Sequence, residues 1–166
     1  MQCPPLGDGI WTNRDDGTFA KFHASTCSVD SVPLIHEAVS QWNAFLERLG
    51  LPAANIVMNR RYDDGSKHIG WHSDDVKDLH ELGLIVVLRT GRRAFQVRDK
   101  ETQRMVFDRA LEPVDLLIMT AHGSNLVTEH CVPKEAGATA ASSSWTFRTS
   151  VNRETLDALR KKIEKA

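Results

Sequence analysis

Residues 59–75 read Asn59-Arg60-Arg61-Tyr62-Asp63-Asp64-Gly65-Ser66-Lys67-His68-Ile69-Gly70-Trp71-His72-Ser73-Asp74-Asp75. His72 and Asp74 are two residues apart, so on an extended strand both side chains leave the same face and can bind one ion. Asp75 alternates to the opposite face. A distant histidine would complete a set of two imidazoles and one carboxylate, which binds non-haem iron(II) and leaves coordination positions open. The stretch therefore predicts part of a metal site on a β scaffold.

Short apolar runs on both sides of this stretch alternate with turn residues, a pattern typical of the strands of a sandwich or barrel. Turns are expected at residues 63–66 and at Thr90-Gly91-Arg92, the second joining a hairpin whose later strand carries Phe95 and Val97. The predicted strands include Asn55-Ile56-Val57-Met58, Leu84-Ile85-Val86-Val87-Leu88, Leu116-Leu117-Ile118-Met119 and Ser144-Trp145-Thr146-Phe147.

Apolar residues at helical spacing flank the β-rich part of the chain. They predict an N-terminal helix over about residues 33–49 and a C-terminal helix over about residues 153–165. We interpret residues 1–166 as a single domain with its core at about residues 55–151, because the length suits one hydrophobic core.

Composition excludes some classes of protein and leaves others open. With 41% apolar and 26% charged residues the chain has the composition of a globular protein. The net charge of −1 and the pI near 6.6 give no overall signal for nucleic-acid binding. The absence of a long apolar run and of a signal-peptide pattern predicts an intracellular protein, cytoplasmic or nuclear, without membrane association. Three widely spaced cysteines favour reduced thiols, and we expect a monomer.

The order of motifs resembles the AlkB-like family of iron(II)/2-oxoglutarate-dependent dioxygenases. The Y-D-D-G turn at residues 62–65 and I-G-W-H-S-D-D at residues 69–75 carry the first part of the resemblance. Four later segments continue it, namely Gly91-Arg92-Arg93-Ala94-Phe95, Val114-Asp115-Leu116-Leu117-Ile118-Met119, His130-Cys131-Val132-Pro133 and Trp145-Thr146-Phe147-Arg148.

This resemblance implies a fold that is mainly β with flanking helices, a double-stranded β-helix or jelly-roll barrel. It implies that His72, Asp74 and His130 bind Fe(II), with 2-oxoglutarate as cosubstrate and O2 as oxidant. His122 is the rival for the second histidine, but it does not precede the Val-Pro pair. Arg148 is the candidate for the distal carboxylate of 2-oxoglutarate, because a guanidinium pairs bidentately with a carboxylate. Tyr62 and Asn59 are further candidates for binding this cosubstrate.

The chain departs from the family pattern at several positions. Ser142 stands where the first Arg of the closing R-x-N-x-T-x-R motif is expected, and Ser144 replaces its Asn. A slipped alignment would make Arg148 the first Arg, so both alignments select Arg148. Val114 replaces a glycine, and Arg60 occupies the expected Asn position of N-x-Y. The acid that follows H-x-D by two positions in nucleobase demethylases is Val76.

The implied reaction is oxidative demethylation of N-alkylated nucleobases in DNA or RNA, which releases succinate and formaldehyde. A base would be flipped out and stacked on an aromatic ring. The candidate substrate contacts are Trp71, Asp75, Arg60 and Arg93. Three alternatives remain open: the same chemistry on a protein or small molecule, a degenerate barrel that only binds, and a zinc hydrolase, for which the sequence lacks a well-placed general base.

Overall fold

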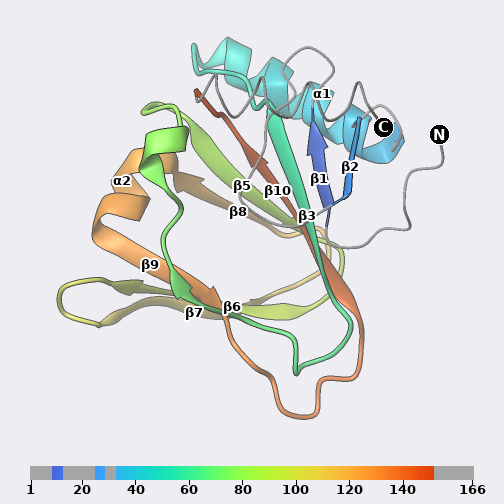
Figure 1. Cartoon of the computed structure of the whole chain (residues 1–166), viewed down its shortest axis with the longest axis vertical. Helices are drawn as coiled ribbons and strands as arrows, with labels where there is room; N and C mark the ends of the chain where they lie inside the picture. The colour runs from blue at the N-terminus through green and yellow to red at the C-terminus, as the bar shows by residue number, and fades with distance from the viewer. Residues whose placement is uncertain (1–8, 13–24, 29–32, 152–166) are drawn as a thin grey trace.

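The computed structural model describes residues 9–12, 25–28 and 33–151 and is drawn in Figure 1. Its helices are α1 (Pro33–Arg48), the short 3-10 helix η2 (Val76–Asp78) and α2 (Ala121–Val127). Its strands are β1 (Gly9–Thr12), β2 (Ser25–Ser28), β3 (Ile56–Tyr62), β4 (Ile69–His72), β5 (Leu84–Arg89), β6 (Arg93–Asp99), β7 (Met105–Leu111), β8 (Leu116–Thr120), β9 (Thr128–Val132) and β10 (Ser142–Arg148).

The strands form two sheets that face each other. The larger sheet has the order β2-β1-β3-β10-β5-β8 and the smaller one has the order β4-β9-β6-β7. All pairings of named strands are antiparallel except that of β1 with β2. The order is non-consecutive because the chain passes repeatedly from one sheet to the other. This arrangement confirms the expected fold class, mainly β with flanking helices.

Alternation along the strands of the larger sheet divides the core into two layers. Val86, Trp145 and Phe147 pack against Ile35 and Val39 of α1. Figure 1 shows α1 on the side of this sheet away from β6, β7 and β9. The opposite face packs against the smaller sheet in a second cluster, which contains Tyr62, Ile85, Val87, Phe95, Leu111, Met119 and Val132. The space between the two sheets is where the candidate site lies.

The predicted hairpin at Thr90-Gly91-Arg92 is wrong, because β5 and β6 belong to different sheets. The turn instead carries the chain across the barrel, and β6 pairs with β7 and β9. A side chain at Gly91 would place its Cβ 2.9 Å from the Cβ of Ser142, so the crossing needs a residue without a Cβ. Local turn chemistry indicates a reversal of the chain but not which sheet receives the next strand.

Helices were predicted on both sides of the β-rich core, and the structure describes one of them. The helix predicted over residues 33–49 corresponds to α1, which is followed by Gly50 in the left-handed region with φ of 68°. The helix predicted over residues 153–165 lies outside the described residues.

Val114, in place of the family's glycine, has φ of 68°, which is strained for a β-branched residue. No helix in the described ranges is both long and apolar enough to span a membrane.

Arg93 joins the loop after β3 to the loop after β9, and it is a structural residue. Only 1% of its side chain is exposed, and Nε lies 3.2 Å from a Glu135 carboxylate oxygen. Its two terminal nitrogens donate to backbone carbonyls of Asp64, Gly65, Lys67 and Pro133. The prediction that Arg93 contacts substrate is therefore wrong, because its side chain is buried and its terminal donors already have acceptors.

We expect Arg93→Ala to lower the free energy of unfolding by about 3–5 kcal/mol, because it leaves Glu135 without its buried partner and several carbonyls without a donor. Urea denaturation followed by circular dichroism measures the change. Arg92→Ala is the matched control, since Arg92 also pairs with Glu135 but is 61% exposed; its cost should stay below about 1 kcal/mol. Equal effects of the two substitutions would contradict this role.

Candidate metal and cosubstrate site

His72, Asp74 and His130 come together between the two sheets. One ligand atom from each residue lies within 4.8 Å of the others. The cause is the pairing of β4 with β9, in which His72 and His130 are register partners, and their ring centroids are 4.3 Å apart. Asp74 follows two residues after His72 in the loop beyond β4. The predicted triad therefore forms one group, of the two-imidazole, one-carboxylate type that binds non-haem iron(II).

Hydrogen bonding selects the nitrogen that His72 can offer to a metal. Its Nδ1 lies 2.8 Å from the carbonyl oxygen of Gly70, so Nδ1 carries the proton and donates. Nε2 then has a free lone pair, which is the arrangement common among metal-binding histidines. The local chain between Gly70 and His72 thus orients the imidazole before any ion binds.

His130 is held in the neutral form that a metal ligand needs. Burial lowers its pKa from 6.5 to about 4, and the electrostatic influences of His72 and Arg148 act in the same direction, against the attraction of Asp74. Phe95 stacks on the imidazole with a centroid distance of 5.5 Å. The ring is therefore fixed in place and uncharged near neutral pH.

The carboxylate of Asp74 has one oxygen engaged and one without a hydrogen-bond partner. Oδ1 accepts from Nη2 of Arg148 at 2.8 Å, whereas Oδ2 is buried without a partner in the part of the chain that the structure describes. An unpaired buried carboxylate oxygen beside two imidazoles is costly unless a cation binds there. The donor set and this unpaired oxygen both fit a divalent metal ion.

Helix α2 supports the ligand loop through residues that sequence reasoning did not select. The side-chain oxygen of buried Asn125 accepts from the backbone N–H of Asp74 at 2.9 Å, and its Nδ2 donates to the carbonyl of Ala121. Ser73 donates to the carbonyl of Thr128 at 2.9 Å. No sequence motif identifies Asn125 as a supporting residue, because its partner Asp74 lies 51 positions away in the chain.

His122, the rival for the second ligand, has a different role. Its Nε2 lies 3.1 Å from the carbonyl oxygens of Val76 and Leu79, so it donates to the backbone around η2. It is not among the residues of the metal group. Val76 lies in η2, and Asp75 begins that helix by accepting from the backbone N–H of Lys77.

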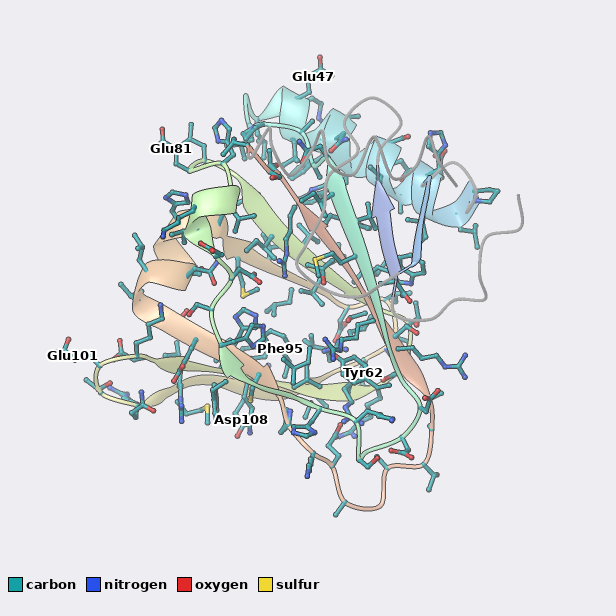
Figure 2. The ribbon with its side chains drawn as sticks, viewed as in Figure 1. Glu47, Tyr62, Glu81, Phe95, Glu101 and Asp108 are labelled. Carbon is teal, nitrogen blue, oxygen red and sulfur yellow. The ribbon has the colours of Figure 1, made fainter. Side chains whose placement is uncertain are left out.

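Of the residues predicted to bind the cosubstrate, Tyr62 and Arg148 line the cavity beside the triad and Asn59 does not. Tyr62 ends β3 with its side chain between the sheets, where Figure 2 shows it near Phe95. Asn59 lies three residues earlier on a regular strand, so its side chain leaves the opposite face. There it donates to the carbonyl of Ser144 at 3.4 Å. The Asn59 prediction is therefore wrong, because Arg60 occupies the position on the face of Tyr62.

Trp71, the aromatic candidate for substrate stacking, does not line the cavity. It neighbours His72 on β4, and the guanidinium carbon of Arg98 lies 4.0 Å from its ring centroid. Arg98 in turn pairs with Glu129 at 2.6 Å. A stacking role for Trp71 stays a prediction, which would place the base outside this cavity. Roles for Asp75 and Arg60 in substrate binding stay predictions.

The depressed pKa of His130 predicts a pH-dependent stability for the chelated protein. Between pH 6.5 and about 4 the unfolded chain binds a proton at His130 and the folded chain does not. Stability therefore falls as the pH decreases through this window, by up to about 3 kcal/mol from this group. Urea titrations of the wild type and His130→Gln in EDTA should show a steeper loss for the wild type; parallel pH profiles would contradict the assignment.

The contact of Asn125 with Asp74 predicts a role in metal affinity. We expect Asn125→Ala to weaken divalent-metal binding about 10–100-fold, because the loop that carries Asp74 loses its support. Titration calorimetry with Mn(II) measures the effect. Leu126→Ala, at an exposed neighbouring position, is the matched control and should bind as the wild type does. Unchanged affinity in Asn125→Ala would show that the loop is held without this contact.

Comparison with known proteins agrees with the fold and the motifs. No family model matches the chain. The DNA oxidative demethylase ALKBH2 of Bos taurus is 39% identical over 77 residues, which are 46% of this chain and 27% of that protein. The structure of OsALKBH1 matches with a TM-score of 0.50 and 19% identity over 76% of this chain and 66% of that one.

YcfD, a ribosomal oxygenase from Escherichia coli, matches with a TM-score of 0.42 and 16% identity over 82% of this chain and 32% of its own. The likeness to OsALKBH1 confirms the fold that the resemblance implied. The chain spans only about a quarter of the length of the curated relative that it matches. In part of its sequence and in its fold, the chain is therefore similar to AlkB-like proteins.

Proposed function

We propose that this protein is an iron(II)- and 2-oxoglutarate-dependent oxygenase that removes N-alkyl groups from nucleobases in DNA or RNA. The observation that carries the proposal is the convergence of His72, Asp74 and His130 in a cavity between two sheets. Iron(II) bound there, with 2-oxoglutarate and O2, would supply oxidative decarboxylation and oxidation of a substrate C–H bond.

The residues of the chain orient these partners and exclude water. The two histidines offer neutral nitrogens and Asp74 offers its unpaired oxygen, and these three groups would hold the metal ion. Ile85, Val87 and Met119 line the same cavity with apolar side chains. Such a wall restricts water and strengthens the electrostatic interactions of bound anions with the arginines.

The lining favours an oxygenase over a zinc hydrolase. A hydrolase with this metal set needs a second acid or base to activate water. Among the described residues that line the cavity, Asp74 is the only acid, and it belongs to the metal group. The histidines of the lining, His72 and His130, are also members of the triad, so no separate general base is present in it.

The nucleobase substrate is supported by the match to ALKBH2, which is described as a DNA oxidative demethylase. The described surface adds little to this support, because arginines that could contact phosphates pair with acids. Arg92 pairs with Glu112 and Glu135, and Arg98 pairs with Glu129. Arg60 remains the candidate for a phosphate contact.

The test is succinate and formaldehyde production from 2-oxoglutarate with Fe(II), ascorbate and air, with and without oligonucleotides that carry N-methylated bases. We expect stimulation by the methylated oligonucleotide, and loss of at least 100-fold in His72→Ala because a triad missing one ligand holds iron poorly. His68→Ala replaces an exposed histidine outside the triad and should keep full activity.

Three outcomes separate the competing functions. Succinate without stimulation by any methylated oligonucleotide would sink the nucleobase substrate and favour a protein or small molecule. Absence of succinate together with tight binding of 2-oxoglutarate would favour a binding barrel. Hydrolysis with Zn(II) and none of the oxidative products with Fe(II) would point to the hydrolase.

A further inference from the structure

Arg89, at the end of β5, is a buried cation; the polar group with the largest favourable electrostatic effect on it is the Tyr62 hydroxyl, and Glu135 attracts it more weakly. Only 1% of the residue is exposed. None of its three guanidinium nitrogens has a hydrogen-bond partner in the described ranges 9–12, 25–28 and 33–151. Burial lowers the pKa of this guanidinium, yet an arginine remains protonated in proteins. A charge in this position is unfavourable in the free protein, so the site favours an anion.

Two aromatic rings lie beside the Arg89 head group. Its guanidinium carbon lies 5.4 Å from the ring centroid of Tyr62 and 6.0 Å from that of Phe95. Such cation–π contacts stabilise the charge from the ring faces and leave the edge donors available. Arg89 and both rings line the same cavity as the metal triad.

Arg148, the other arginine in the cavity lining, pairs with Asp74 of the metal group. Its Nη2 donates to Asp74 at 2.8 Å, so its charge is balanced by a metal ligand. The family resemblance implied that Arg148 binds the distal carboxylate, but the ion pair places this residue beside the triad. Arg89 has no acidic partner within the cavity lining, where Asp74 is the sole acid among described residues.

Strand register gives the order of groups along the cavity. In the antiparallel pairing of β5 with β10, Ser144 lies opposite Arg89, Thr146 opposite Val87 and Phe147 opposite Val86. Arg148 is four residues beyond Ser144, which is about 13 Å along the strand. The cavity therefore runs from the metal triad and Arg148, past apolar Val87, to Arg89.

Two hydroxyl groups stand at the Arg89 end. Tyr62 and Ser142 are register partners on β3 and β10, and both hydroxyl oxygens are buried without a hydrogen-bond partner among the described residues. Ser144, opposite Arg89, has a short side chain that leaves room in the cavity for the guanidinium. A carboxylate placed here would receive donors from the guanidinium and from a hydroxyl.

We propose that Arg89, and not Arg148, binds the distal carboxylate of the 2-oxo dicarboxylate cosubstrate, with the Tyr62 hydroxyl as a second donor. The inference rests on the proposed function. A 2-oxo acid group at the metal, a short apolar linker and a terminal carboxylate match the order of groups along the cavity. The cation that the closing motif lacks at Ser142 is supplied by the neighbouring strand.

The test is calorimetric binding to the Mn(II)-loaded protein of 2-oxoglutarate and of 2-oxopentanoate, the five-carbon 2-oxo acid without the distal carboxylate. We expect the wild type to prefer 2-oxoglutarate by about 100-fold, as for a buried charge-assisted hydrogen bond. Arg89→Met should bind the two acids within about threefold of each other, and Arg89→Lys should recover part of the preference. Arg148→Met should weaken Mn(II) binding and retain the preference.

Thermal melting of the chelated, ligand-free protein separates binding from folding. Arg89→Met should melt at a higher temperature than the wild type, because it removes a buried unpaired charge. A preference retained in Arg89→Met and lost in Arg148→Met would overturn the assignment. Equal binding of both acids by the wild type would overturn it and leave the oxygenase intact, whereas no binding of either acid would sink the proposed function with it.

Discussion

The pairing of β4 with β9 is the constraint on which the candidate site depends. It sets His72 opposite His130 across one pair of strands, although the two residues are far apart in the chain. A register shift between Ile69 and His72 lets both of these side chains line the cavity despite their odd spacing. Because a slip of one residue would turn His72 away from His130, the register of this pair determines whether three ligands can meet.

Charge is distributed unequally along the cavity between the sheets. At one end Arg148 and Asp74 balance each other, and at the other Arg89 lies against aromatic rings with no acid beside it in the described cavity lining. A buried charge without an adjacent acid, such as that of Arg89, reduces the stability of the folded protein unless an anionic ligand pairs with it. The folded protein therefore carries an anion site whose favourable interaction is realised on binding, which is a common property of functional sites.

The loops around the site are held by polar contacts that reach across the chain. Arg93 caps carbonyls of two loops, and Gly65 allows the close approach of the Glu135 backbone, since a Cβ there would lie 1.9 Å from the Glu135 carbonyl oxygen. On the opposite side, Asn125 of α2 holds the backbone of Asp74. Each contact removes freedom from a segment next to the metal ligands, so the ligand geometry is set before the ion binds.

The sequence by itself determined the class of fold and indicated the pair His72 and Asp74, because alternating apolar runs and this pair are local patterns that need no knowledge of distant contacts. His130 was named only through the resemblance to a family, and the structure brings it to the other two residues. The sequence also indicated that a cation was missing at Ser142. Only the tertiary structure decided that the turn at Gly91 crosses between sheets, that Arg93 is buried and that Asn59 faces away from Tyr62. The same holds for Arg89 and Asn125: their positions follow from which strands and loops become neighbours, and non-local pairing of this kind leaves no periodic signal in the residues themselves.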